Sequence, residues 1–417
     1  MKNLRMQQEM TDRGRLEIRV NARIQARPVS GARVTVSYTG DPQNVIEELI
    51  TDGDGRTETL DLATPPLEYS LEPNVNQPYS EYTVKVEAEG YELVEVTGSE
   101  LLSGEQSVQQ VDLKLAEGAA FADVTIPDHT LFGEYPAKIP ESEIKPTRES
   151  GEIVLSRVVI PEYIIVHDGA PTDSTARDYY VRYRDYIKNV ACSEIYATWP
   201  DAAIRANILA IMSFTLNRVY TEWYRNKGYD FTITSSTAYD HKWIYGRNIF
   251  DSISLVVDEI FADYLSRPNV KQPILTQYCD GNRVSCPNWM SQWGSKNLAD
   301  QGYSTIQILR NYYGDNMYIN TAEEISGIPS SWPGYDLTIG SSGNKVLQMQ
   351  EQLNVIAGGY SSISTVYENG YFDEETQDAV EAFQRLFGLP VSGIVDYPTW
   401  YKIQSIYVAV TRIAELQ

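Results

Sequence analysis

The sequence predicts a multidomain α+β protein with an N-terminal all-β sandwich, a central mixed α/β domain and a small C-terminal helical domain. Three observations support this prediction. The chain of 417 residues is longer than one hydrophobic core ordinarily organises. Short segments in which apolar and polar residues alternate fill its first part. Long runs of apolar residues at helical spacing follow only in the central and last parts.

The predicted sandwich covers residues 14–115. Residues 16–22, 34–38 and 82–88 are typical of strands because β-branched and apolar residues alternate with polar ones. The sequence DGDG at 52–55 predicts a hairpin turn, since it lacks the further acidic ligands and the closing Glu of a calcium loop. The pieces PVSGARVTV, TDGDGRTETL and YTVKVEAEGY resemble transthyretin-like, carboxypeptidase-regulatory-like modules.

A linker is predicted at residues 116–161. It contains Pro127, Pro136, Pro140 and Pro146 together with a charged ESGE sequence. This composition favours an extended, exposed chain, which is where proteases cut. We therefore expect a processing region here, with a plain tether as the alternative.

Charge limits the class of partner. Lys and Arg number 34 against 57 Asp and Glu, which gives a net charge of −23. Such a chain repels nucleic acid and anionic membranes, whereas its 30 Tyr and 7 Trp offer aromatic faces to a glycan. There is no apolar run of about 18 residues that would span a membrane and no apolar run near the N-terminus that would make a secretory signal.

The central domain is predicted at residues 162–325. Its clearest element is a helix over 201–224, where apolar residues recur at helical spacing. Thr198 is the expected N-cap, and Pro200 is expected in the first turn, where its missing N–H costs little.

Two blocks of this domain resemble the stage II sporulation protein D family of lytic transglycosylases. They are YIKNVACSEIYATWPDAAIRANILAIMSFTLNRVY and CPNWMSQWGSKNLADQGYSTIQILRNYYG, and TITSSTAYDHKWIYG between them is similar to a further segment of that family. The resemblance implies that Glu194 is the catalytic residue. It also implies a substrate groove lined by Trp199, Tyr245, Ser291, Gln292 and Trp293.

Two positions depart from the family pattern. Met212-Ser213 replaces an Arg-Thr or Arg-Ser pair, and CPNW at 286–289 replaces a segment that contains a His. Cys279 and Cys286 are close enough in sequence to form a disulfide. Two reduced thiols are the alternative. With His241 they do not form a recognised zinc-ligand set. No metal and no cofactor are therefore predicted.

The chemistry of Glu194 also follows from its residue type. Cleavage of a glycosidic bond needs a proton for the leaving oxygen. A glutamate among apolar neighbours keeps that proton near neutral pH because burial disfavours its charged form. In a lytic transglycosylase the C6 hydroxyl of the same muramic acid attacks the anomeric carbon, so one acid is sufficient.

The C-terminal domain is predicted at residues 338–405. The sequences GSSGNKVLQMQEQLNVIAGGY, ENGYFDEETQDAVEAFQRLFGL and PVSGIVDYPTW resemble the peptidoglycan-binding domain of the PG-binding-1 type. Loops that carry Tyr371, Asp373 and Tyr397 are the expected glycan contacts.

As a whole, the chain resembles clostridial spore cortex-lytic enzymes. The resemblance implies a precursor in the cortex and coat region of the spore that becomes active when a protease removes its N-terminal portion during germination. Its partners would be cortex peptidoglycan and the activating protease. Two alternatives stay open: a non-catalytic wall-binding protein of spore assembly, and a muramidase that uses water.

Overall fold

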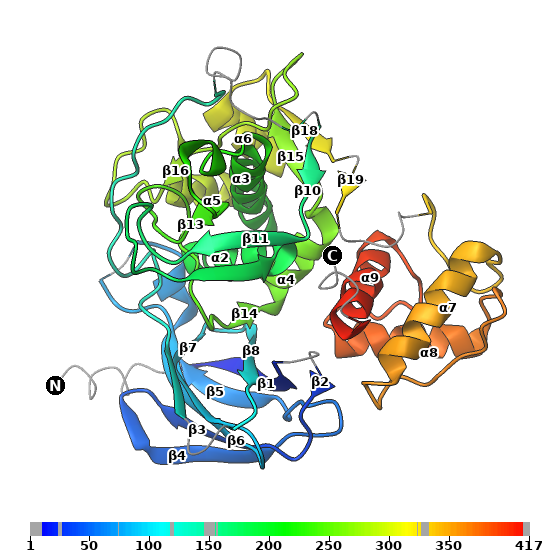
Figure 1. Ribbon diagram of the computed structural model, residues 1–417. Coiled ribbons are helices and arrows are strands. Elements are labelled where there is room, and N and C mark those ends of the chain that lie inside the picture. Colours follow the sequence, from blue (N-terminus) through cyan, green and yellow to red (C-terminus); the bar gives the residue numbers. More distant parts are fainter. Residues whose placement is uncertain are drawn as a thin grey trace.

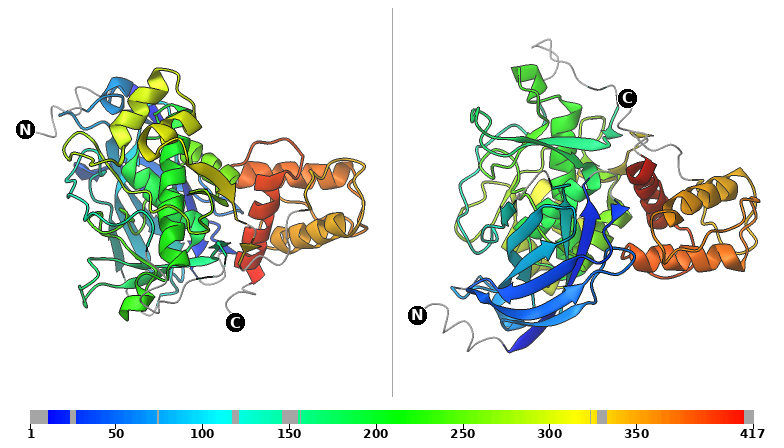
Figure 2. Two further views of the ribbon diagram at one scale, coloured as in Figure 1. Left: turned by 90° about the horizontal axis from the view of Figure 1, so that it is seen from above. Right: turned by 60° about the horizontal axis from the view of Figure 1, so that its bottom comes forward.

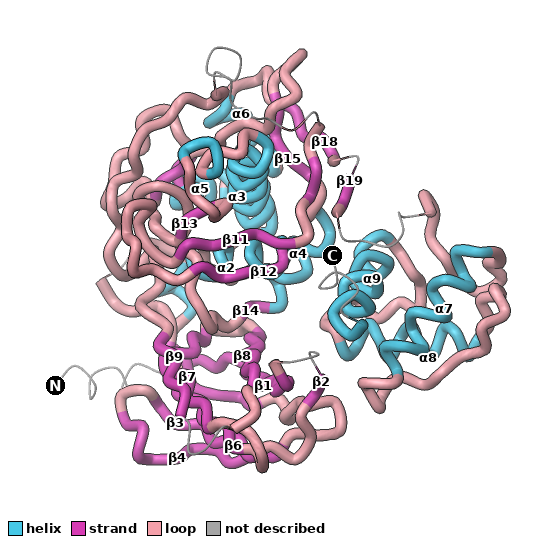
Figure 3. Tube along the Cα trace, viewed as in Figure 1, coloured by secondary structure: helices cyan, strands magenta, loops and turns pink. Residues whose placement is uncertain are grey.

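The fold class predicted from the sequence is confirmed by a computed structural model. A β-rich N-terminal region lies next to a mixed central domain, and a helical C-terminal domain packs on the central one (Figure 1). In Figure 3 the N-terminal region consists mainly of strands, the central domain contains both helices and strands, and the C-terminal domain is helical. The structure describes residues 11–23, 27–73, 75–116, 121–145, 155, 157–322, 324–326 and 333–411.

The N-terminal region is a sandwich of two five-stranded sheets. One sheet contains β1 (Asp12–Ala22), β2 (Arg27–Pro28), β5 (Leu60–Thr64), β8 (Gln106–Leu113) and β14 (Ile249–Phe250). The other contains β3 (Arg33–Tyr38), β4 (Asp41–Ile50), β6 (Ser80–Glu87), β7 (Leu93–Leu101) and β9 (Phe121–Thr125). Alternation turns Leu16, Ile18, Val34, Val84 and Val96 inward, where each is buried. A short 3-10 helix, η1 (Leu67–Ser70), follows β5.

The sandwich extends beyond the predicted range 14–115. It begins at Asp12, gains β9 as an edge strand parallel to β7, and accepts β14 from the central domain. In the register of β14 with β8, Ile249 is opposite Val108 and Phe250 is opposite Ser107. The two domains therefore share a sheet.

Residues 126–145, which we name the bridging segment, differ from the predicted free linker. The Thr130 N–H donates to the Ser193 carbonyl at 3.2 Å, and the Ile139 N–H donates to the Ala238 carbonyl at 2.8 Å. The extended, proline-containing backbone thus pairs with the central domain and not only with water. Residues 117–120, 146–154 and 156, which include part of the predicted processing region, lie outside the described residues.

The central domain is built around α3 (Asp201–Tyr220), the helix predicted at 201–224. Apolar side chains cover α3 on all sides because other elements surround it. Thr198 does not cap it: Pro200 is the N-cap, and the Thr198 hydroxyl donates to Ser70 Oγ of the sandwich at 2.8 Å. The other central elements are β10 (Val159–Ile160), β11 (Tyr163–His167), β12 (Asp178–Arg182), α2 (Tyr183–Glu194), η2 (Arg225–Lys227), β13 (Ile233–Thr234), α4 (Asp251–Ile260), β15 (Asp263–Ser266), β16 (Tyr278–Cys279), β17 (Met290–Ser291), α5 (Gln292–Asp300), α6 (Thr305–Tyr313), β18 (Tyr318–Thr321) and β19 (Glu324–Ile325).

The C-terminal domain contains α7 (Asn344–Ala357), α8 (Glu374–Leu386) and α9 (Tyr397–Thr411). Two buried glutamines hold its loops in the same way. Gln350 accepts from the Gly370 N–H and donates to the Thr376 hydroxyl, whereas Gln384 accepts from the Gly393 N–H and donates to the Thr399 hydroxyl. No described helix is long and apolar enough to cross a membrane.

Helix α9 joins the C-terminal domain to the central one (Figure 2). The Asp258 carboxylate on α4 lies 2.7 Å from Lys188 Nζ, 3.2 Å from Arg184 and 3.5 Å from Lys402 Nζ on α9. Burial raises the pKa of Asp258, but these three cations outweigh burial and hold it well below the usual range. Cations of two domains thus converge on one buried carboxylate.

We predict that Asp258→Asn lowers the free energy of unfolding at pH 7 by about 3–5 kcal/mol, because three buried cations lose their counter-charge. Since the folded-state pKa is depressed, the advantage of the wild type is present above the ordinary carboxyl pKa of about 3.9 and shrinks as the pH falls below it. Urea unfolding at several pH values measures this.

The matched control is Glu259→Gln on the same helix. The Glu259 side chain is 42% exposed and pairs with Arg205, so its loss should cost less than about 1 kcal/mol. Equal losses for the two variants would contradict a special role for Asp258.

Candidate functional site

Glu194 is the last residue of α2, and its side chain is fully buried. The helix ends there because Ile195 takes an extended conformation. One carboxylate oxygen accepts a hydrogen bond from the Lys242 backbone N–H at 2.6 Å, and the other accepts from the Tyr278 hydroxyl. Two donors from distant segments therefore fix the orientation of the carboxyl group.

The surroundings of Glu194 favour its protonated form. Burial raises the pKa of Glu194 above its usual value, and the Lys138 charge and the hydrogen bonds from Tyr278 and Lys242 only partly oppose burial. Burial and the nearby Glu194 carboxyl likewise raise the pKa of Tyr278 well above its usual range. The acid can thus retain a proton nearer neutral pH than an exposed glutamate does.

The bridging segment contributes to the burial of this site. Lys138 is buried, its ammonium donates to the Asp240 carbonyl, and it lies 4.3 Å from the centroid of the Tyr278 ring. Burial lowers the pKa of Lys138, whereas Glu194 and Asp240 oppose that shift. Tyr135, from the same segment, is 8% exposed. The Glu194 carboxyl is therefore closed to solvent.

The segment MSQWG lies against the loop that follows Glu194. The Gln292 side-chain amide donates to the Glu194 carbonyl at 3.1 Å. Ser291 caps α5, because its hydroxyl oxygen accepts from the Gly294 N–H at 2.8 Å. Trp293 is 4% exposed and its ring is 5.0 Å from that of Trp199. The structure thus brings these predicted residues to the loop after Glu194.

Gln292, Trp293 and Trp199 do not line an open groove here, in contrast to the expectation from sequence. Each is buried, and the Trp199 indole N–H donates to the Ser70 carbonyl of the N-terminal sandwich at 3.0 Å. The physical reason is that the sandwich and the central domain pack over these aromatic rings.

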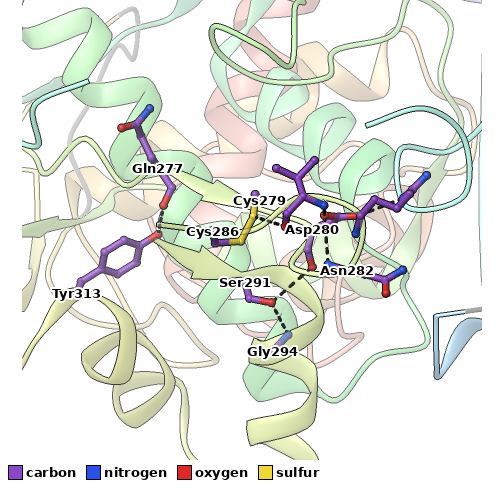
Figure 4. Close-up of a disulfide and its surroundings, with 10 residues drawn as sticks. Gln277, Cys279, Asp280, Asn282, Cys286, Ser291, Gly294 and Tyr313 are labelled. Atoms are coloured by element: carbon purple, nitrogen blue, oxygen red, sulfur yellow. Dashed lines mark hydrogen bonds and ion pairs between the residues drawn. A yellow bond between two sulfur atoms is a disulfide. The ribbon is translucent and has the colours of Figure 1, made fainter. Parts of the chain in front are cut away.

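A disulfide joins Cys279 and Cys286, with 5.6 Å between their Cα atoms (Figure 4). Within its loop, Asp280 accepts from the backbone N–H groups of Arg283 and Val284, each at 3.0 Å. The Arg283 guanidinium then donates to the Thr130 carbonyl of the bridging segment at 2.8 Å. The cysteines are thus bonded to each other, and among the described residues no cluster of three or more His, Cys, Asp or Glu is arranged to hold a metal ion.

Tyr245 does not lie with the Glu194 loop. Its ring is 5.1 Å from that of Tyr179 and 6.3 Å from that of Trp243, in a cleft between the sandwich and the central domain. The sequence prediction of a single groove missed this separation. It also missed Lys138 and Tyr278, because no local pattern in the sequence relates them to Glu194.

The three predicted glycan contacts of the C-terminal domain have different surroundings. Tyr371 is 50% exposed. Asp373 caps α8 by accepting from the Thr376 N–H at 2.9 Å, which engages one of its two carboxylate oxygens. The Tyr397 ring stacks 5.9 Å from Phe261 of the central domain. Tyr397 thus contacts the central domain, and its role in glycan binding stays a prediction.

Residues 342–403 match the family of peptidoglycan binding domains. The match lies inside the predicted range 338–405 and covers the helices α7 and α8 and the first part of α9. The protein thus carries a peptidoglycan-binding domain, which supports association with the cell wall. The match covers less than half of the chain, so it assigns a family to this domain alone.

No curated protein matches the chain. Among solved structures, the Bacillus anthracis TIE protein is 18% identical over 25% of this chain and 17% of its own length, with a TM-score of 0.18. The minor pilin GBS52 of Streptococcus agalactiae is 12% identical over 28% of this chain and 49% of its own length, with a TM-score of 0.18. A catechol 1,2-dioxygenase of Acinetobacter radioresistens is 14% identical over 28% of this chain and 59% of its own length, also with a TM-score of 0.18. The chain spans less than two thirds of each, and scores this low support no assignment.

We predict that Glu194→Gln is more stable than the wild type above pH 7 and about equally stable near pH 4. Because the folded-state pKa of this acid is raised, its stabilising contribution is present below the ordinary pKa and is lost as the pH rises through the folded-state pKa. Thermal unfolding from pH 4 to pH 8 measures the difference. The exposed Glu375→Gln serves as control, and parallel curves for wild type and Glu194→Gln would argue against a perturbed acid.

Proposed function

We propose that the protein is a spore cortex-lytic enzyme, a lytic transglycosylase that cleaves the bond from N-acetylmuramic acid to N-acetylglucosamine and leaves 1,6-anhydromuramic ends. The observation that carries the proposal is Glu194, a buried carboxyl group with a raised pKa that two donors hold in place. The peptidoglycan-binding domain at 342–403 would hold the chain on its polymeric substrate.

In this mechanism Glu194 donates its proton to the glycosidic oxygen as the bond to the anomeric carbon breaks. The C6 hydroxyl of the muramic acid then attacks that carbon, and the Glu194 carboxylate accepts the hydroxyl proton. Attack within one sugar gains from proximity, so no water needs to be positioned. The Tyr278 hydroxyl and the Lys242 N–H would stabilise the carboxylate between the two proton transfers.

Two neighbouring carboxylates support a single-acid mechanism. Asp240 accepts from Arg218, from the Tyr224 hydroxyl and from Thr234. Asp280 is likewise occupied by N–H groups of its own loop. A hydrolase needs a second carboxylate that is available to water or to the anomeric carbon, and neither of these two is.

The closure of Glu194 supports a precursor that a protease activates. The bridging segment joins the sandwich to the central domain, and its Lys138 lies in the same buried cluster as Glu194. Cleavage after this segment would allow it and the sandwich to leave. A non-catalytic wall-binding protein is the second candidate, and the same closure is the observation that favours it.

We predict that the uncut chain releases few fragments from purified cortex peptidoglycan and that a chain cut between residues 145 and 155 releases many. The cut is made by a specific protease whose recognition sequence replaces residues 148–153. Mass spectrometry of the fragments should find 1,6-anhydro ends. Reducing ends would indicate a muramidase that uses water, and no fragments would indicate the non-catalytic candidate.

In the cut chain, Glu194→Gln should reduce cleavage by about 10²–10⁴-fold, the contribution of a general acid. Sedimentation with peptidoglycan should show that the variant still binds, because the wall-binding domain is unchanged. Glu259→Gln is the control for a loss of charge elsewhere in the domain. Retained cutting by Glu194→Gln would mean that another group donates the proton.

A further inference from the structure

A cleft of about 770 Å³ lies between the N-terminal sandwich and the central domain. Strands β7, β8 and β9 form one wall, and β12, α2 and the loop at 243–249 form the other. This volume is within the range of about 300–1,000 Å³ that is typical of ligand sites. None of the functional steps described above uses it.

The walls of the cleft are held rigidly. Arg247 and Glu100 form a fully buried ion pair across the two domains, with 2.5 Å between guanidinium nitrogen and carboxylate oxygen. Next to them the Asn248 side chain donates to the Glu100 carbonyl at 2.7 Å and accepts from the Glu100 N–H at 3.0 Å. The cleft is therefore a built feature of the domain contact.

Aromatic rings form one side of the cleft. Tyr179 lies 5.1 Å from both Trp243 and Tyr245, measured between ring centroids, and Tyr245 is 41% exposed. Rings of this kind stack on the C–H faces of sugars because both surfaces are apolar and flat. Tyrosine also offers a hydroxyl at its edge.

The polar lining is balanced in charge, although the chain as a whole carries −23. Basic and acidic side chains of the sandwich and of the segment just before β12 line the cleft, among them Arg23, Lys114, Arg177, Glu92, Asp112 and Asp123. A polyanion would require an excess of cations. Hydroxyl and acetamido groups, which both donate and accept hydrogen bonds, are complementary to a mixed lining.

We propose that this cleft is a second glycan-binding site, which takes an oligosaccharide of N-acetylated hexosamines. The choice of ligand rests on the peptidoglycan-binding domain of the same chain and not on catalysis by Glu194. The position of the cleft also fits this ligand. Trp243 follows Lys242, whose N–H holds the Glu194 carboxyl, so a glycan in the cleft lies one short segment away from the acid. Because the sandwich forms one wall, the site belongs to the uncut chain.

The test measures binding of tetra-N-acetylchitotetraose to the full chain by isothermal titration calorimetry. To isolate the cleft, all variants carry Tyr371→Ala in the C-terminal domain. In that background Tyr179→Ala or Tyr245→Ala should weaken binding about tenfold, in line with the loss of a stacked ring. Tyr245→Phe keeps the ring and should restore most of the affinity.

The matched control is Tyr180→Ala, because Tyr180 neighbours Tyr179 on β12 but is 73% exposed outside the cleft. Its affinity should equal that of the background. Unchanged affinity in Tyr179→Ala and Tyr245→Ala, or no binding of the oligosaccharide in the background, would overturn the proposal. Product analysis with Glu194→Gln tests the catalytic acid separately. A failure of the cleft proposal can therefore be told apart from a failure of the proposed enzymatic function.

Discussion

The arrangement of the domains depends on the buried ion pair between Arg247 and Glu100. The Arg247 guanidinium pairs with Glu100 of the sandwich and also donates to the Cys192 carbonyl at 2.6 Å, two residues before Glu194 on α2. Burial of both charges is unfavourable by several kcal/mol per ion unless they stay paired. The sandwich, the end of α2 and the loop at 243–249 are therefore held in one geometry. Separation of the sandwich would leave a buried cation without its partner.

This constraint explains why the N-terminal region is integrated with the central domain. The sandwich sheet continues into β14, the Trp199 indole donates to η1, and the bridging segment pairs with the loops around Glu194. An inhibitory region attached only by a flexible tether would leave the acid exposed for part of the time. Here closure is maintained by many contacts, which suits a long-lived inactive precursor of the enzyme we propose.

Much of the fold follows from local patterns, and the failures have physical causes. Alternation predicted the sandwich strands, and helical spacing predicted α3 and the helical character of the C-terminal domain. Helix α2 escaped prediction because it is buried on nearly all sides and no side chain caps its N-terminus. The bridging segment was predicted as a linker since its prolines indicate an extended backbone but not the surface it pairs with. For the site, the family resemblance pointed to Glu194, whereas Lys138 and Tyr278 become its neighbours only through tertiary packing.

The same geometry relates wall binding to the cleft. Asp258 fixes the peptidoglycan-binding domain through Lys402, while Lys188, which also bonds Asp258, lines the cleft from α2. Helix α2 thus contacts the C-terminal domain at one end, lines the cleft along its length and carries Glu194 at the other end. In the function that we propose, a glycan held by the C-terminal domain would lie near a cleft and an acid that this helix connects. In the precursor that we propose, removal of the sandwich and the bridging segment would open the acid and abolish one wall of the cleft together, so that a binding form of the chain would become a cutting form in one step.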